Sequence, residues 1–317
     1  MREIGVVLIR RIAFALPVIL GITLYLFFIL EFSPADPRYA ALGMYASEEQ
    51  RDKLAKDFHL DDPLTVRYGR FVKNLATGNL GVSIYGSKPV TQVLAEKLPV
   101  TLSIAVFSIA GALVIAFALG VTSAYFAGSW WDSLVRAFSF GSLSIPMFWL
   151  GLLLIQIFSL HWRWLPAGGY VELNESMIGW ARSLVLPSVS LALPVGGFLT
   201  RVVRSSVLDE LDRDYVRTAR GGGLSDREII WRNVLKNALI SPLTVIGLQA
   251  GYILSGAVLV EVVFALPGLG NTMLQVSQQG DIGVILGIAL IAALFFVVIN
   301  LLVDIAYVLL NPRARES

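Results

Sequence analysis

The chain has 317 residues, of which 56% are hydrophobic and 15% are charged, and its formal net charge at pH 7 is +2. Soluble domains are typically about 45–50% apolar and about 25% charged, so this composition indicates a membrane protein. The small net charge gives no reason to expect a nucleic-acid partner, and the absence of cysteine excludes disulfides and thiolate metal sites. Two histidines, His59 and His161, are too few for a histidine-rich metal site.

Six windows are long and apolar enough to cross a hydrocarbon core of about 30 Å. Each is predicted to be a helix, because backbone polar groups in lipid must be hydrogen-bonded within the segment. The sequence therefore predicts an all-α membrane protein with six transmembrane helices. Their approximate ranges are Val6–Leu30, Leu98–Phe126, Ser133–Leu160, Leu184–Val203, Leu239–Val260 and Ile282–Leu310. The prolines expected to bend or break these helices are Pro17, Pro146, Pro187 and Pro194.

Basic residues are unevenly distributed between the segments that join these helices. Lysine and arginine are frequent in residues 205–237, the charged loop, whereas residues 261–281, the acidic segment, contain neither. Lysine and arginine in short loops mark the cytoplasmic side of a membrane. We therefore expect both termini and the charged loop to be cytoplasmic in a multi-pass protein. The basic residues beside the first and last windows are Arg2, Arg10, Arg11, Arg313 and Arg315.

Residues 32–97 are the only long stretch whose composition indicates water-exposed structure, and the orientation above places them outside the membrane. Ser47 and Gln50 match a capping box, which predicts a short helix ending near Phe58. Asp62 followed by Pro63 predicts the N-cap and first position of a second helix. Apolar residues then recur at helical spacing, namely Leu64, Tyr68, Phe71, Val72 and Leu75.

A third, amphipathic helix is predicted over residues 89–97, with Val90, Val93 and Leu94 on one face. We expect Pro99 to end it before the chain enters the membrane, so that this helix lies in the interface. The external segment is either a cap over the ends of the spans or a landing surface for a partner protein. The residues alone leave both interpretations open.

Two helices joined by a glycine corner are predicted within the charged loop. Residues 205–220 favour helix, and Ser225 with Glu228 forms a capping box that begins a second helix. Gly221 and Gly222 each cost about 1 kcal/mol in a helix interior, so they are expected at the corner. A phosphate-binding P-loop is excluded because no strand precedes the glycines and no Gly-Lys-Ser/Thr run follows them. Connections between helices typically need about 2–8 residues, so this longer loop favours an exposed helix that lies in a partner's groove.

The acidic segment has a carboxylate at each end and helix-breaking residues between them. We expect either a re-entrant turn at an external gate or a simple external hairpin. The candidate residues for this gate, or for contact with a partner outside the membrane, are Glu261, Phe264, Pro267, Gly268, Gly270 and Asp281.

The stretch DYVRTARGGGLSDREIIWRNVLKNALISPLTVIGLQ resembles the EAA loop of binding-protein-dependent ABC importer permeases. That motif has Glu-Ala-Ala, three residues, glycine, and an apolar helix leading to a proline. The matching positions here are Arg217, Thr218, Ala219, Gly223 and Pro242. Arg-Thr-Ala in place of Glu-Ala-Ala is typical of the peptide-importer branch.

Four further segments resemble peptide permeases in the same order, so the resemblance covers nearly the whole chain. They are GNLGVSIYGSKPVTQVLAEKLPVTLSIA, SIPMFWLGLLLIQIFSLHWRWLPAGGY, EVVFALPGLGNTMLQVSQQGDIGVILG and NLLVDIAYVLLNPRAR. The sequence departs from the usual pattern at three positions. Gly221 and Gly222 replace the usual Ala-Lys, which puts the stiffness of the first loop helix in doubt, and Asn311 stands where Asp is common.

The resemblance implies a type I ABC importer permease of the prokaryotic cell (inner) membrane. The chain would divide into a first helix (1–31), an external helical segment (32–97) and a five-helix core (98–317). It would form half of a pathway for short peptides by alternating access. Its implied partners are a second homologous permease subunit, two ATPase subunits and a periplasmic or extracellular substrate-binding protein. ATP and Mg²⁺ would be bound by the ATPase subunits, so no cofactor is expected in this chain.

A coupling helix at about Leu211–Arg220 is implied to fit a groove of an ATPase subunit. We expect Tyr215, Val216 and Ala219 to face that groove, because they lie at positions i, i+1 and i+4 of a helix. The resemblance also assigns Thr218 to this contact, and Arg217 and Arg220 would meet acidic groups at the groove's rim. Gly223 is expected to matter because a bulky residue there would push the two loop helices apart.

Several alternatives stay open. The same machinery could import nickel or a metal chelate, glutathione or an oligosaccharide. A secondary transporter belongs to a different class and requires internal repeats and ionisable groups at mid-membrane, neither of which the sequence shows. Asp304 lies close to the cytoplasmic end of the last predicted helix, a position that favours a structural role over an ion route.

Overall fold

The computed structural model describes residues 2–31, 42, 46–57, 59–84 and 88–310. In that part of the chain the structure is helical, with one isolated β-bridge between Val82 and Pro89. The chain divides into two compact units. Unit 1 comprises Met1–Arg11, Leu102–Leu266 and Phe296–Ser317, and unit 2 comprises Ile12–Thr101 and Pro267–Phe295.

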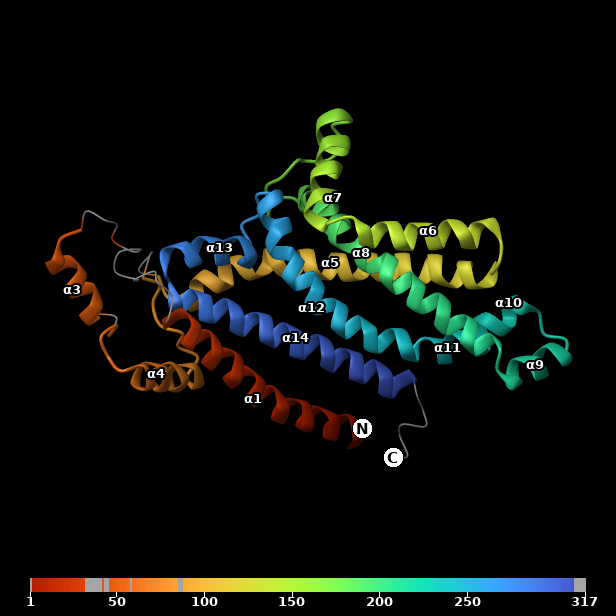
Figure 1. Cartoon of the computed structure of the whole chain (residues 1–317), viewed down its shortest axis with the longest axis horizontal. Helices are drawn as coiled ribbons and strands as arrows, with labels where there is room; N and C mark the ends of the chain where they lie inside the picture. Colours follow the sequence, from red (N-terminus) through yellow and green to blue (C-terminus); the bar gives the residue numbers. More distant parts are fainter. Residues whose placement is uncertain (1, 32–41, 43–45, 58, 85–87, 311–317) are drawn as a thin grey trace. The chain divides into compact units, whose positions relative to one another are not determined.

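Unit 1 is built around one long helix, α8 (Met177–Leu211). Its most apolar window is 78% buried, against 33% for α5 (Val90–Tyr125) and α12 (Ile240–Val263). Four other helices of the unit contact it, namely α6, α7, α11 and α12 (Figure 1). Their bounds are Trp130–Ser144 for α6, Met147–Leu154 for α7, Ile155–His161 for η1, and Leu235–Ala238 for α11.

Small residues let α5, α6 and α8 approach to backbone distance. A Cβ atom on Gly120 of α5 would lie 2.8 Å from the Cβ of Val203 on α8. A Cβ atom on Gly197 of α8 would meet the hydroxyl of Ser142 on α6. Such small-residue contacts are the usual way for membrane helices to pack closely, because apolar burial gives no driving force between helices in lipid.

The predicted third span is a bent pair of helices. The helix axes of Trp130–Ser144 and Met147–His161 differ by 104°, and Pro146 lies at the break. The expected break at Pro146 is therefore confirmed. By contrast, α8 is continuous through Pro187 and Pro194, and α1 (Arg2–Glu31) is continuous through Pro17, so none of these three breaks its helix.

Unit 2 contains most of α1, together with α3 (Glu48–Asp57), α4 (Leu64–Ala76) and α13 (Leu269–Gln279). The first turns of α5 and the first half of α14 (Ile282–Leu310) complete it. Its hydrophobic core joins residues of α5, α13 and α14. The core residues are Val90, Leu94, Leu269, Val276, Val284, Ile285 and Ile288.

A helix is present where one was predicted over residues 89–97, but its predicted end at Pro99 is wrong. Helix α5 begins at Val90 and continues through Pro99 to Tyr125. Val90 and Leu94 are 0% and 4% exposed and belong to the core of unit 2. Burial of this apolar face offsets the one backbone hydrogen bond that proline removes, so the helix does not end there.

Of the two capped helix starts predicted in the external segment, the capping box at Ser47 is confirmed and the N-cap at Asp62 is wrong. Ser47 N–H donates to Gln50 Oε1 at 3.0 Å and Gln50 N–H donates to Ser47 Oγ at 3.3 Å, as predicted. The predicted end of α3 at Phe58 lies outside the described residues. Asp62 does not cap α4: Pro63 occupies the N-cap position, and Asp62 accepts a hydrogen bond from Arg70 at 2.5 Å.

Among the residues that the structure describes, four helices are long and apolar enough to cross a membrane: α5, α8, α12 and α14. The bent pair from α6 to η1 adds a fifth if it counts as one span, and the apolar part of α1 in the described residues is the shorter stretch Leu16–Ile29. The chain is therefore a multi-pass membrane protein, but this count does not reach six spans. The structure does not describe the side chains of the basic residues near the two termini. The orientation of the chain in the membrane therefore stays a prediction.

Candidate functional site

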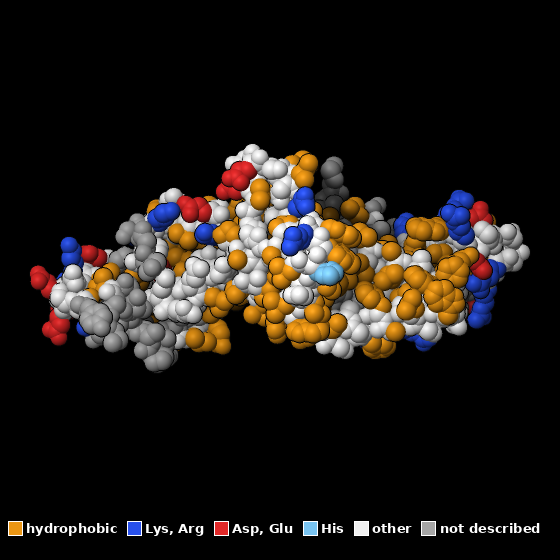
Figure 2. Space-filling model, turned by 90° about the horizontal axis from the view of Figure 1, so that it is seen from above, with side chains coloured by type: hydrophobic (Ala, Val, Ile, Leu, Met, Phe, Trp, Pro, Cys, Tyr) orange, Lys and Arg blue, Asp and Glu red, His pale blue; other side chains and the backbone are white. Residues whose placement is uncertain are grey.

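The charged loop is a chain of short helices that follows α8. Helix α8 ends at Leu211, and α9 (Asp214–Gly221) begins after a break at residues 212–213. The predicted single helix over residues 205–220 is therefore interrupted, and the coupling helix begins later than expected. After the corner come α10 (Asp226–Ile229) and η2 (Ile230–Val234), which continue into α11. Figure 2 shows Lys and Arg side chains gathered at the end of unit 1 that carries α9 and α10.

Helix α9 has one face turned to its own chain and one face turned outward. Val216 is 0% exposed, so the expectation that it faces a partner's groove is not met. Tyr215 and Ala219 are half-buried beside it. The outward positions are those of Arg217, Thr218 and Arg220, which are all exposed.

Tyr215 ties the helices of the charged loop together. Its hydroxyl donates to Glu210 Oε1 on α8 at 2.9 Å, and it is also hydrogen-bonded to the side chain of Asn237 on α11. Burial raises the pKa of Tyr215 above its usual value, which favours the protonated phenol that donates this hydrogen bond. One side chain of α9 therefore joins the end of the preceding helix to the start of the next span.

The glycine corner is a Schellman motif. Leu224 N–H donates to the carbonyl of Ala219 at 3.2 Å, and Gly223 N–H donates to that of Arg220 at 3.0 Å. Gly223 has φ +84°, a conformation that glycine adopts without strain, and a Cβ atom there would meet open space. The expected reason for Gly223 is therefore wrong: backbone conformation requires glycine at this position, and crowding between the two helices does not.

Two polar contacts hold α10 next to this corner. Arg220 Nε lies 2.9 Å from Asp226 Oδ1, and both side chains are at least half exposed. Ser225 and Glu228 form the predicted capping box. The hydrogen bond from Ser225 holds the pKa of Glu228 below its usual value.

The acidic segment is divided between the two units, and both of its candidate residues in unit 1 are buried. Glu261 and Phe264 are 0% and 1% exposed. Gly169 N–H donates to the carbonyl of Phe264 at 2.9 Å, and a Cβ atom on Gly168 would lie 2.5 Å from the same oxygen. Close backbone approach therefore requires glycine at position 168 and fixes Phe264 in place.

The unit 2 part of the acidic segment forms a helix in place of the predicted turn or hairpin. Gly268 is the N-cap residue of α13, Gly270 is buried in its first turn, and Pro267 is exposed before it. Asp281 is 0% exposed and accepts from Ser83 Oγ at 2.5 Å and from Val284 N–H at 3.2 Å. It thereby caps α14 and holds the chain near Ser83 against it.

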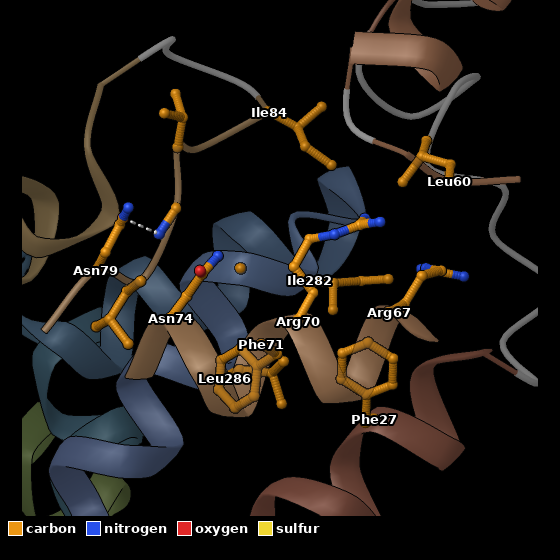
Figure 3. Close-up of a pocket in the computed structure, with 14 residues that line it drawn as sticks. Phe27, Leu60, Arg67, Arg70, Phe71, Asn74, Asn79, Ile84, Ile282 and Leu286 are labelled. Atoms are coloured by element: carbon orange, nitrogen blue, oxygen red, sulfur yellow. Dashed lines mark hydrogen bonds between the residues drawn. The ribbon is translucent and has the colours of Figure 1, made fainter. Parts of the chain in front are cut away.

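A small pocket lies in unit 2, between α1, α4 and the start of α14 (Figure 3). Phe27, Phe71 and Leu286 line it together with the arginines Arg67 and Arg70. Arg70 pairs with Asp62, and Arg67 lies over the ring of Phe27 at 5.7 Å. Its volume of about 180 Å³ is below the range of about 300–1,000 Å³ for pockets that hold drug-sized ligands, so we assign no substrate to it.

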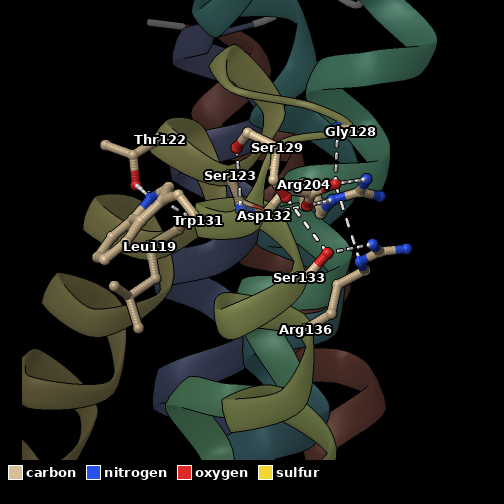
Figure 4. A network of polar contacts seen from close by, with 10 residues as sticks. All are labelled: Leu119, Thr122, Ser123, Gly128, Ser129, Trp131, Asp132, Ser133, Arg136 and Arg204. Carbon is tan, nitrogen blue, oxygen red and sulfur yellow. Dashed lines mark hydrogen bonds and ion pairs between the residues drawn. The ribbon is translucent and has the colours of Figure 1, made fainter.

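One polar site in unit 1 has no counterpart in the sequence predictions. Asp132, in the first turn of α6, is 1% exposed and is paired with Arg204 of α8 (Figure 4). The two residues are 72 positions apart, so no periodicity or spacing links them. The only available signal was a single acid between two apolar windows.

Comparisons with known proteins agree with this architecture. Residues 116–316 match the family described as binding-protein-dependent transport system inner membrane component, and residues 5–105 match the N-terminal part of such membrane components. A Brucella abortus protein named as a peptide transport system permease is 39% identical over 308 residues, which cover 97% of this chain and 98% of the relative.

Two further relatives are similar over nearly their whole length. The oligopeptide transport system permease protein AppB of Bacillus subtilis is 36% identical, covering 96% of this chain and 98% of the relative. The glutathione transport system permease protein GsiC of Pectobacterium atrosepticum is 35% identical, covering 97% and 98%. The chain therefore belongs to the family of inner membrane components of binding-protein-dependent transport systems.

Proposed function

We propose that this chain is the permease subunit of an ATP-driven importer and forms half of a transmembrane pathway for short peptides. The observation that carries the proposal is the similarity, over nearly the whole chain, to permeases named for peptide, oligopeptide and glutathione transport. Glutathione is itself a tripeptide, so these names share one chemical class of substrate.

The importer would also contain a second homologous permease subunit, two ATPase subunits that bind ATP and Mg²⁺, and a substrate-binding protein outside the membrane. Helix α9 would lie in a groove of an ATPase subunit with its exposed side, Arg217, Thr218 and Arg220, toward that subunit. The buried side chain of Val216 and the hydrogen bonds of Tyr215 support this role, because they attach α9 to the chain. Movement of the ATPases would then reach α8 and drive alternating access.

Both termini and the charged loop would lie in the cytoplasm, and the acidic segment would lie outside. The external gate or the contact with the binding protein would involve the candidate residues of the acidic segment. Glu261, Phe264 and Asp281 are each buried within their own unit, and Pro267 is the candidate exposed enough to touch a binding protein.

Reconstitution tests the proposal. The complete importer is placed in proteoliposomes with its binding protein, and uptake of radiolabelled di- and tripeptides is measured with and without ATP. We expect uptake that requires ATP and the binding protein. Uptake driven by an ion gradient without ATP would contradict the proposal, and uptake of nickel chelates or oligosaccharides in place of peptides would overturn its substrate class.

A further inference from the structure

Asp132 accepts hydrogen bonds from four donors at the start of α6 (Figure 4). Arg204 provides two of them, from Nε to Oδ1 at 2.7 Å and from Nη2 to Oδ2 at 2.9 Å. Ser123 Oγ donates to Oδ1 at 2.6 Å, and Gly128 N–H donates to Oδ2 at 3.1 Å. A carboxylate held by a two-pronged guanidinium contact has a fixed orientation as well as a fixed distance.

These donors come from three different elements. Ser123 lies in the last turn of α5, Gly128 in the turn between α5 and α6, and Arg204 in the later part of α8. The carboxylate is 1% exposed and the Arg204 side chain is 21% exposed, so water competes little for the pair. The corner between α5 and α6 is therefore fastened to α8 at one buried point.

Glycine packing continues this attachment along the helices. Gly120 of α5 lies against Thr200 and Val203 of α8, at distances where an added Cβ atom would be 2.9 Å or less from either residue. Arg204 directly follows Val203, so the ion pair sits at the end of this close contact. The helices touch at backbone distance and are also joined by the ion pair next to this contact. For this reason α5, α6 and α8 have little freedom to slide past one another.

Helix α8 also leads directly to the charged loop. Glu210, six residues after Arg204, accepts the hydrogen bond of Tyr215 on α9. Helix α8 therefore connects two contacts, the hydrogen bond from Tyr215 of α9 to Glu210 and the ion pair of Arg204 with Asp132. A displacement of α9 by a partner reaches α8 first and, through the Asp132–Arg204 pair, the corner of α5 and α6.

We propose that Asp132 and Arg204 are positioning residues for transport: they transmit movement of the charged loop from α8 to α5 and α6. This inference rests on the proposed function, since it assigns the pair a place in the same transport cycle. Buried ion pairs are often no more stabilising than apolar packing of the same volume, so the presence of this pair is weak evidence for a role in stability. Its directional geometry suits transmission, because a planar guanidinium holds a carboxylate in one orientation.

The test replaces Arg204 by lysine in the complete reconstituted importer. Arg204→Lys keeps the positive charge but loses the two-pronged contact, so α8 and the α5–α6 corner stay paired yet loosely held. We expect assembly with the partner subunits, measured by size-exclusion chromatography, to be retained. Peptide uptake per ATP hydrolysed is expected to fall roughly tenfold, which is within the range of measured coupling energies.

A matched control comes from the same cluster. Arg136 approaches Asp132 Oδ2 with its Nε at 3.8 Å, is 49% exposed and donates to Ser133 Oγ at 3.1 Å. Arg136→Lys therefore makes the same chemical change without breaking a close contact to Asp132. Its uptake per ATP should stay within about twofold of wild type. Asp132→Asn serves as the second variant if Arg204→Lys does not assemble, because it keeps the shape of the side chain and removes its charge.

The outcomes separate this inference from the proposed function. Arg204→Lys complexes, or Asp132→Asn complexes in their place, with wild-type uptake per ATP would overturn the inference alone. The same holds if uptake falls only in proportion to the amount of assembled complex, since the pair would then merely stabilise the fold. A wild-type importer without ATP-driven uptake would overturn the proposed function and this inference with it.

Discussion

The charged loop and the acidic segment both join long helices, and both turn at glycines, but they treat ionisable side chains in opposite ways. In the charged loop the acids and bases are mostly exposed and pair with near neighbours, as Arg220 does with Asp226 six residues later. In the acidic segment Glu261 and Asp281 are 0% exposed, and Asp281 binds Ser83, which is 198 residues away in the chain. Ionisable side chains therefore have two roles here. In the charged loop they form an exposed face, and in the acidic segment they are buried and stabilise the fold.

The largest effect on stability is expected from removing the buried carboxylate of Asp281 in the acidic segment. Asp281→Ala leaves the Ser83 hydroxyl and the first turn of α14 without their acceptor, which is expected to lower the free energy of unfolding by about 2–4 kcal/mol. The melting temperature of the purified protein in detergent measures it. Asp281→Asn keeps an acceptor in place and should lose much less; equal losses for the two variants would show that the hydrogen bonds are not the cause.

A smaller effect is expected at the glycine corner. Gly223→Val forces a β-branched residue into the left-handed region and should destabilise the charged loop by about 1–2 kcal/mol. Gly221→Ala is the control, because that position has open space and no positive φ, and it should be neutral or slightly stabilising. The rate of hydrogen exchange of the backbone amides of residues 214–229 measures the stability of the charged loop in both variants. Gly223→Asn should destabilise the loop less than Gly223→Val does. Equal destabilisation by the two variants would point to a steric effect and contradict the conformational explanation.

The capping box should give a smaller effect that depends on pH. The pKa of Glu228 is lowered from 4.5 in the folded protein, so its carboxylate stabilises the fold above pH 4.5 and this contribution is lost as the pH falls through the lowered pKa. Glu228→Ala should therefore melt below wild type at pH 7, and the difference should shrink in acid. A difference that grows as the pH falls would contradict the capping role.

The smallest effect on stability is expected at the exposed face of α9. Arg217 lies 3.7 Å from Asp214, and their side chains are 73% and 99% exposed, so Arg217→Ala should change the free energy of unfolding by less than about 0.5 kcal/mol. If this face meets an ATPase subunit, the same variant should reduce the stimulation of ATP hydrolysis by the loaded binding protein. Unchanged stability together with unchanged stimulation would remove Arg217 from the proposed contact.

Most signals carried within a few residues were predicted from the sequence, with the exception of the N-cap expected at Asp62. Both capping boxes are present, Pro146 marks a break, and the glycine run marks a corner, because each depends on neighbouring backbone groups. The all-helical membrane architecture also followed from apolar windows, since lipid leaves the backbone few alternatives.

Features that depend on distant residues could not be predicted in the same way. Pro99 is a helix breaker by local rules, but burial of Val90 and Leu94 in the core of unit 2 keeps the helix intact. Val216 lies at a helical position that could face either way, and only packing decides that it turns inward. The pairs Asp132–Arg204 and Ser83–Asp281 link residues with no sequence relation, so only the folded chain brings them together.

The bend at Pro146 has a consequence for the surrounding bilayer. Each arm of the pair has 15 residues, or about 22 Å of helix, which is less than the hydrocarbon thickness of about 30 Å. Neither arm matches that thickness alone, and Phe148, Trp149 and Leu152 of the second arm are exposed. Local thinning of the lipid or a neighbouring subunit would relieve such a hydrophobic mismatch, so we expect this part of the protein to respond to the length of the lipid acyl chains.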